Sequence, residues 1–305
     1  MSHVLTGAAP RASVEVLRQE RQRLERTTAR RTRVGRGWGT LQAEMDAALS
    51  TTPTDIPEVL TQLARLQSIL DRLPPGPGQH RVASFNSLYR TITGQVQGYS
   101  DGGRFADPKF LELLDVEFAK LYFEALRQWG EPRGDAPQSW ALLFRHGHDR
   151  RLTPRSAAML GVNAHINHDL PLALVAAWER LGPPASGAPQ HPDYLLINEI
   201  FFDQIPALRR RFATAWQLEI DRLNGRFDDW SERLVVAATR GLAWEQAQRL
   251  WPLRDQPAAL AGATEVIDAA TALLGQAIVA SDSWTRRAWL WLVSLARRAA
   301  AALPG

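Results

Sequence analysis

The chain has 305 residues, 45% of them hydrophobic, which is enough for a large core in one or two domains. Cysteine is absent, which excludes disulfides, thiolate metal sites and a cysteine nucleophile. The net charge of +4 is uneven, because residues 11–36 hold nine arginines and three glutamates, a net of +6, and leave −2 for the rest of the chain.

Residues 1–40 are predicted to form a flexible, partly helical basic arm. Its glutamates at 15, 20 and 25 lie three or four residues from arginines, a spacing typical of a solvated helix. Because the positive charge is confined to this arm, the composition argues against nucleic acid as a partner. The N-terminus lacks the apolar core of a signal peptide, and no run approaches the ~20 apolar residues of a membrane span. We therefore expect a cytoplasmic protein.

Helical periodicity dominates the chain beyond the arm, and proline and glycine interrupt it. The interruptions are PPGPG at 74–78, GEPRGDAP at 130–137, GPPASGAPQHP at 182–192 and WPLRDQP at 251–257. The clearest helix is 110–129, with an apolar stripe formed by Leu111, Leu114, Phe118, Leu121 and Ala125. We predict an all-α fold, a single domain of about ten helices over 41–282.

Residues 161–172, GVNAHINHDLPL, place polar groups inside an apolar run. If residues 154–168 form a helix, Pro171 predicts a kink near Asp169. His165, His168 and Asp169 then share one face of that helix.

Asn163 and Asn167 fall on nearly the opposite face, so the helix has two polar sides separated by apolar positions. This pattern predicts an interior helix whose polar groups meet specific partners, because an unpaired buried polar group costs ~1–3 kcal/mol. We expect both asparagine side chains to be largely buried and hydrogen-bonded.

Three interpretations of this cluster compete. In the first, Asp169 or Asn167 caps a helix that begins near Pro171, and the histidines form ordinary core hydrogen bonds. In the second, His165 and Asp169, four residues apart, ligate a metal ion, with His168 as a third ligand or an acid–base group. In the third, the cluster binds a polar ligand or performs metal-free acid–base chemistry.

A second segment, HPDYLLINEIFFDQI at 191–205, is a candidate to complete a site. Asp193 is in a good position to cap its helix, and Glu199 and Asp203 share one face four residues apart. By contrast, HGHD at 146–149 is predicted to be a surface loop. The signatures HExxH, GxxxxGK[ST] and GxSxG and a glycine-rich dinucleotide loop are absent from the sequence.

Five strings resemble an uncharacterised bacterial family, domain of unknown function 5995. They are FNSLYRTIT at 85–93, FADPKFLELLDVEFAKLYFEAL at 105–126, SWALLF at 139–144, LGVNAHINHDLPLAL at 160–174 and HPDYLLIN at 191–198. The resemblance covers about 55–275 and implies no known activity.

His165, Asp169, Pro171 and Leu172 are also similar to the H-x-x-x-D and proline pattern of the helical zinc phospholipase C and P1 nuclease group. The pattern departs from that group in its spacing to the proline and in Ala173, which stands where a further histidine is expected. The chain also does not begin with that group's metal-binding tryptophan. This resemblance implies a metal-dependent hydrolase.

The leading functional hypothesis is a metal-dependent hydrolase of a small-molecule or phosphoester substrate. Its divalent metal ion would be held by His165, Asp169 and Asp203, with His168 and Glu199 as catalytic residues. No residue is assigned to any other cofactor. The alternative is a non-enzymatic binding or structural protein in which the same side chains form a buried hydrogen-bond network.

Residues 283–305 are predicted to form a C-terminal amphipathic helix. Its apolar stripe is Trp284, Ala288, Trp291, Leu292 and Leu295, and two Arg-Arg pairs accompany it. We expect this stripe to pack on the domain and the arginines to face solvent. The alternative is a peripheral membrane contact, because a basic helix with tryptophans is suited to a lipid interface.

Overall fold

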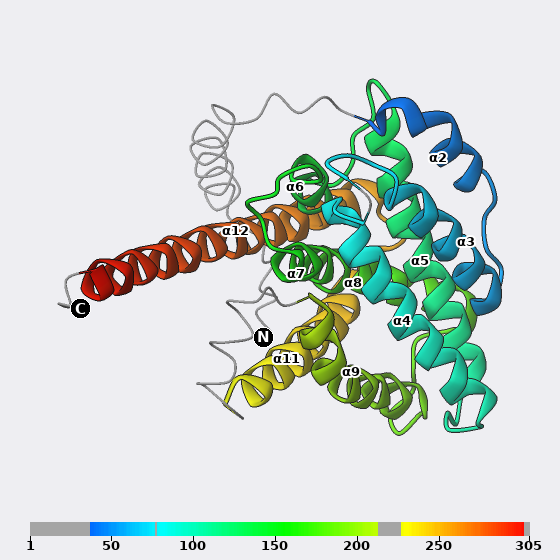
Figure 1. The fold of residues 1–305 in the computed structure, drawn as a ribbon. Helices are drawn as coiled ribbons and strands as arrows, with labels where there is room; N and C mark the ends of the chain where they lie inside the picture. Colours follow the sequence, from blue (N-terminus) through cyan, green and yellow to red (C-terminus); the bar gives the residue numbers. More distant parts are fainter. Residues whose placement is uncertain (1–36, 77, 213–226, 302–305) are drawn as a thin grey trace, which may run out of the picture.

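A computed structural model describes residues 37–76, 78–212 and 227–301, and within them the side chains outside 205–235 and 283–301 (Figure 1). The described chain is helical throughout and contains no strand, so the predicted all-α fold is confirmed. The α-helices are α2 (Gln42–Ala48), α3 (Ile56–Leu70), α4 (Arg81–Asp101), α5 (Pro108–Gly130), α6 (Gln138–Arg145), α7 (Pro154–Ala164), α8 (Leu170–Leu181), α9 (Gln190–Phe212), α11 (Phe227–Leu250) and α12 (Pro257–Ala301). Three shorter elements are η1 (Gly39–Leu41), η2 (His165–Asp169) and η3 (Trp251–Leu253).

Local sequence sets where several helices begin. The Asp107 side chain accepts a hydrogen bond from the backbone N–H of Phe110 at the start of α5, and Thr153 does the same for Ser156 at the start of α7. A proline follows each of these capping residues, where its missing N–H would have no helical partner in any case. The capping residue and the proline together specify each start without tertiary help.

The core consists of two clusters of buried side chains, and helix α4 contributes to both. Val82, Phe85 and Tyr89 belong to the cluster shared with α3, α5, α6 and α7. Leu88 and Ile92, on the other side of α4, belong to the cluster that includes α8, α9 and α11. A helix with two buried faces lies inside the domain, which is the position from which side chains can line an internal site.

Helices α4 and α7 approach each other closely at Gly161. A Cβ atom at this position would lie 2.2 Å from the ring of Phe85, far inside van der Waals contact. Glycine is therefore required here by the packing of the two helices. The contact holds α7, and the π-helix η2 that follows it, against α4.

Helix α12 is attached to the body by two buried carboxylates. Asp268 accepts hydrogen bonds from the backbone N–H groups of Gln138 and Ser139, at the start of α6. Asp282 accepts from the N–H and the hydroxyl of Thr153, at the start of α7. These acids thus cap neighbouring helices from another part of the chain, a role that local sequence does not reveal.

One helix of the described chain, α12 over Pro257–Asp282, is long and apolar enough by length and composition to cross a membrane. The expectation that no segment approaches this length was therefore wrong. Length and composition of one helix are weak evidence for a membrane span. The hydrogen bonds that Asp268 and Asp282 accept join this segment to α6 and α7.

The predicted N-terminal arm and C-terminal helix lie only partly within the described residues. Residues 1–36 of the predicted arm lie outside the described residues, but Trp38 is buried and its Nε1 donates to the carbonyl of Leu126 at 3.0 Å. Helix α12 continues through residue 283 without a break, and Figure 1 shows its C-terminal part extending beyond the other helices. The side chains of the predicted stripe from Trp284 to Leu295 lie outside the described residues.

Candidate functional site

The polar cluster at 163–169 lies in a π-helical turn. Helices α7 and α8 form one continuous rod, interrupted only by η2, where the N–H of Leu170 bonds to the carbonyl of His165, five residues back. Pro171 has no N–H and its ring would crowd the carbonyl of Asn167 in a regular α-helix, and we attribute the widened turn to this proline. The predicted irregularity is therefore present, as a π-turn rather than a break. Such turns are frequent at functional sites.

Asp169 is the centre of a buried hydrogen-bond network. Its Oδ2 accepts from His165 Nδ1 at 2.9 Å and from Trp140 Nε1 at 2.9 Å, and its Oδ1 accepts from His168 Nδ1 at 2.7 Å. Asp169 is 1% exposed, and both histidines are 4% exposed. The sequence prediction that these three side chains share one face is confirmed by these distances.

The network sets the charges of its members. Burial favours the neutral carboxyl of Asp169, but the hydrogen bonds from His165 and His168 outweigh burial and lower its pKa. For His165 burial dominates and lowers the pKa. For His168 burial acts in the same direction, but the hydrogen bond and charge of Asp169 overcome it and raise the pKa. His165 is thus held as a neutral imidazole whose Nδ1 carries the proton.

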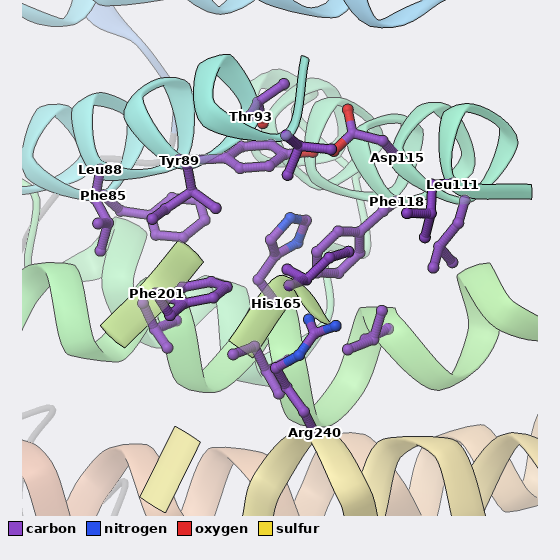
Figure 2. Close-up of a pocket in the computed structure, with 17 residues that line it drawn as sticks. Phe85, Leu88, Tyr89, Thr93, Leu111, Asp115, Phe118, His165, Phe201 and Arg240 are labelled. Carbon is purple, nitrogen blue, oxygen red and sulfur yellow. The ribbon is translucent and has the colours of Figure 1, made fainter. Parts of the chain in front are cut away.

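The other nitrogen of His165 has no partner. Its Nε2 is buried and makes no hydrogen bond to the residues that the structure describes. The ring stacks on Phe118, with centroids 3.4 Å apart and planes inclined by 7°, and the edge of Tyr89 meets it at 4.5 Å. Figure 2 shows the ring between these two aromatic side chains, at the centre of a pocket.

The pocket lies between α4, α5, α9, α11 and the α7–η2–α8 rod. It contains about 630 Å³ of space that protein atoms do not fill, part of it open to solvent. Its walls are mainly apolar and aromatic. The apolar and aromatic lining residues are Phe85, Leu88, Ile92, Val96, Leu111, Leu114, Phe118, Val162, Ile166, Leu170, Ile197 and Phe201. Of these, Phe118, Val162 and Phe201 are half-buried, so the pocket is not sealed.

Five polar side chains complete the lining: Tyr89, Thr93, Asp115, His165 and Arg240. The Tyr89 and Thr93 side chains interact with each other. Buried atoms of the other three, Asp115 Oδ2, His165 Nε2 and Arg240 Nε, have no hydrogen-bond partner in the described part of the chain. Figure 2 shows Tyr89, Thr93 and Asp115 on one side of His165 and Arg240 on the other. Buried polar groups in proteins are nearly always paired, so three orphaned atoms in one pocket require an explanation.

Burial shifts both Asp115 and Tyr89 toward their neutral forms. Burial raises the pKa of Asp115 to about 7. Burial, followed by the nearby charge of Asp115, raises the pKa of Tyr89 well above its ordinary value. A carboxyl group with a pKa near neutrality in an apolar pocket can donate or accept a proton, which is a property of catalytic and binding sites.

Arg240 is a buried cation, and none of the acidic side chains that the structure describes is its partner. It is 2% exposed, and burial lowers its pKa. Its Nη2 donates to the carbonyl of Tyr194 at 2.9 Å, and its guanidinium lies 4.3 Å from the Tyr194 ring centroid. The Tyr194 hydroxyl in turn donates to the carbonyl of Arg240 at 2.6 Å, so α9 and α11 hold the arginine in a fixed position.

The predicted second segment does not meet the cluster. Glu199 and Asp203 lie on α9, but both side chains are exposed and neither lines the pocket. His191 is also exposed and packs on Trp244, with ring centroids 4.5 Å apart. Ile197 and Phe201, from the opposite face of the same helix, line the pocket instead. The apolar face of α9 turned inward, and this left Glu199 and Asp203 in solvent.

The predicted metal roles of His165, Asp169 and Asp203, and the catalytic roles of His168 and Glu199, stay predictions. Within the described part of the chain, no group of three or more histidine, aspartate or glutamate side chains is arranged to hold a metal ion. Hydrogen bonds from protein donors already occupy both oxygens of Asp169, so this carboxylate orients His165 and His168 rather than offering a free ligand.

The two asparagines and the HGHD loop also have defined places. Asn163 is buried, and its Nδ2 donates to the carbonyl of Thr271 on α12 at 2.9 Å, as expected. Asn167 is only half-buried and donates to Asn163 Oδ1, so its predicted burial was overstated. The prediction of a surface loop was wrong for His146, which is buried and bonds to Asp149 at 3.3 Å.

Asp115 and Arg240 were not singled out from the sequence. A signal for Asp115 exists, because it lies four residues after Leu111 and three before Phe118, inside the apolar stripe of α5. An acid within such a stripe is either paired or functional. Arg240 occurs in an ordinary stretch, VVAATRGLAW, and no local pattern marks it as buried.

Fold and site together define an all-helical protein with an internal pocket of apolar walls and orphaned polar groups. The chain belongs to a family of unknown function, DUF5995, whose model matches residues 56–281. The family predicted from the sequence is thereby confirmed. No curated protein and no solved structure matches the chain significantly, so the similarity to the phospholipase C and P1 nuclease group stays a prediction.

Proposed function

We propose that the protein binds a small molecule with an apolar body and polar ends in the pocket around His165. One observation carries this proposal: three buried polar atoms without partners in the described chain, on Asp115, His165 and Arg240, converge on one otherwise apolar pocket. Apolar walls with a few convergent polar groups are the usual composition of a small-molecule site.

Energetics support a ligand at this position. Each unpaired buried polar group costs roughly 1–3 kcal/mol, so the three groups together destabilise a fold whose total stability is marginal. A ligand that forms hydrogen bonds with them recovers part of this free energy on binding. The aromatic walls from Phe85, Phe118 and Phe201 supply the hydrophobic contribution.

A second candidate function, metal-free acid–base catalysis on the bound molecule, is favoured by the His165–Asp169 pair. The carboxylate fixes the protonated Nδ1 and leaves Nε2 as a base at the pocket wall, as in many general-base sites. Nitrogen-15 chemical shifts of His165 test this assignment. A neutral ring with the proton on Nδ1 at pH 7 supports it, and a doubly protonated ring contradicts it.

A metal-dependent hydrolase has less support. Metal binding by Asp169 would require hydrogen bonds to His165, His168 or Trp140 to break. His165 Nε2 is then the single imidazole nitrogen offered to an ion, with Asp169 as its orienting partner. Addition of zinc or manganese to metal-free protein tests this function. A rise in melting temperature that disappears in His165→Gln would favour the hydrolase over metal-free binding.

Calorimetric titration with hexanol, a small molecule of the required polarity, tests the pocket directly. We expect saturable binding that Val162→Phe weakens, because this half-buried lining side chain would then fill part of the pocket. The matched control is Leu195→Phe on the exposed face of α9, which should leave binding unchanged. Equal binding by all three proteins, or no binding by the wild type, would contradict the proposal.

A further inference from the structure

We propose that the natural ligand of this pocket is an organic anion with one carboxylate group, and that the carboxylate pairs with the guanidinium of Arg240. This inference rests on the proposed small-molecule site and adds the chemical class of its ligand. It begins from Arg240, the cation among the pocket-lining residues.

The charge of Arg240 is not neutralised by the part of the chain that the structure describes. Its contacts are the carbonyl of Tyr194 and the aromatic rings of Tyr194 and Phe201, at 4.3 and 5.9 Å from the guanidinium carbon. Its Nε donates to nothing although it is buried. A guanidinium stays charged at all physiological pH values, and a buried charge without a counter-ion is strongly unfavourable.

Asp115 does not supply the missing counter-ion. It is the carboxyl group of the pocket lining, but among the described residues it forms no ion pair or hydrogen bond with Arg240. Figure 2 shows the two side chains on opposite sides of His165. Asp115 also has a pKa of about 7, so near neutrality a large fraction of it is uncharged. The pocket therefore has a cationic end and a neutral hydrogen-bonding end.

The rest of the lining decides between carboxylate and phosphate. Arg240 is accompanied by no lysine or second arginine among the lining residues, and the walls beside it are aliphatic and aromatic. A single guanidinium matches the single charge and planar shape of a carboxylate, whereas a dianionic phosphate would keep an uncompensated charge in an apolar pocket. Tyr89, Thr93 and Asp115 then face the other end of the molecule, where they offer hydrogen bonds to a hydroxyl or carbonyl group.

The competing explanation is that Arg240 only joins α9 to α11 through Tyr194. The reciprocal hydrogen bonds and the cation–π contact fit such a role. The two explanations differ in the unliganded protein. Replacing an uncompensated buried charge by an apolar side chain of similar length is neutral or stabilising, whereas removing a structural link lowers stability.

The experiment compares hexanoate with hexanol, which differ in the charged group, by calorimetric titration at pH 7. We expect the wild type to bind hexanoate at least about tenfold more tightly than hexanol, the size expected of a charge-assisted hydrogen bond. Arg240→Met should remove this preference, and Arg240→Lys should keep part of it. The matched control, Arg254→Met, removes a cation that stacks on Trp251 outside the pocket and should preserve the preference.

The outcomes separate the two proposals. If hexanol binds but hexanoate binds no more tightly, or if Arg240→Met keeps the preference, the anion inference is overturned and the small-molecule site stands. If neither compound binds the wild type, the site itself is contradicted. Melting temperatures add a ligand-free test: an unchanged or raised value for Arg240→Met supports an uncompensated charge, and a fall of several degrees supports the purely structural role.

Discussion

The two sides of His165 differ in how completely their polar groups are paired. On the Nδ1 side, Asp169 accepts three hydrogen bonds from two histidines and a tryptophan, all of them buried. On the Nε2 side, Asp115 and Arg240 each keep a buried atom without a hydrogen-bond partner in the described part of the chain. The first side is a buried network whose polar groups are paired, and the second is the side on which we propose that the ligand binds. The two nitrogens of the His165 ring therefore have different roles, which their different surroundings set.

The largest effect is expected from removing Asp169, the acceptor on the paired side. Asp169→Leu leaves the N–H groups of Trp140, His165 and His168 buried without a partner, so we expect a loss of about 3–5 kcal/mol in the free energy of unfolding. Urea denaturation measures it. Asp203→Leu on exposed α9 is the control and should change stability by no more than about 0.5 kcal/mol. A loss below about 1 kcal/mol for Asp169→Leu would show that the network does not support the fold.

On the unpaired side, removal of the Asp115 carboxyl is expected to raise the free energy of unfolding rather than lower it. The pKa of Asp115 is about 7 in the folded protein against 3.8 as the reference value, so the folded state binds the extra proton between these pH values. Stability should therefore fall as pH rises from about 4 to about 7. Asp115→Asn removes this penalty, and we expect it to be more stable than the wild type by on the order of 2–3 kcal/mol at pH 8.

Melting temperatures across pH 4–8 check this prediction, and the difference between the two proteins should vanish near pH 4. A variant that is less stable than the wild type at pH 8 would mean that the charged carboxylate of Asp115 has a partner. The pocket would then have lost one of its orphaned groups, and the contrast between the two sides of His165 would weaken.

The asparagines give a smaller test, because they differ in burial on one helix. Asn163→Leu removes the donor to the Thr271 carbonyl and should lower stability by roughly 1–3 kcal/mol. Asn167→Leu affects a half-buried side chain bonded only to Asn163 and should have less effect. Denaturation curves of both variants check the order. Equal effects would indicate that the link from α7 to α12 contributes little.

Much of the fold was predictable because it depends on neighbours in sequence. The apolar stripe of 110–129 lies within α5, and the proline- and glycine-rich breaks fall between helices. The shared face of His165, His168 and Asp169 follows from helical spacing alone. The second candidate segment, 191–205, was expected to bring acidic side chains to the cluster, and the structure does not place them there. Its helix was expected, but the inward face of α9 carries Ile197 and Phe201 rather than Glu199 and Asp203.

The sequence by itself determined the helical class, several helix starts, the irregular turn before Pro171 and the pairing of His165 with Asp169. All of these depend on groups within a few residues of one another. Only the tertiary structure decided that Asp115 and Arg240 meet His165 in one pocket. Burial and the lack of a partner are properties of packing between α4, α5, α9 and α11, so no local pattern encodes them. The residues that carry the proposed function are therefore the ones that spacing alone could not assemble.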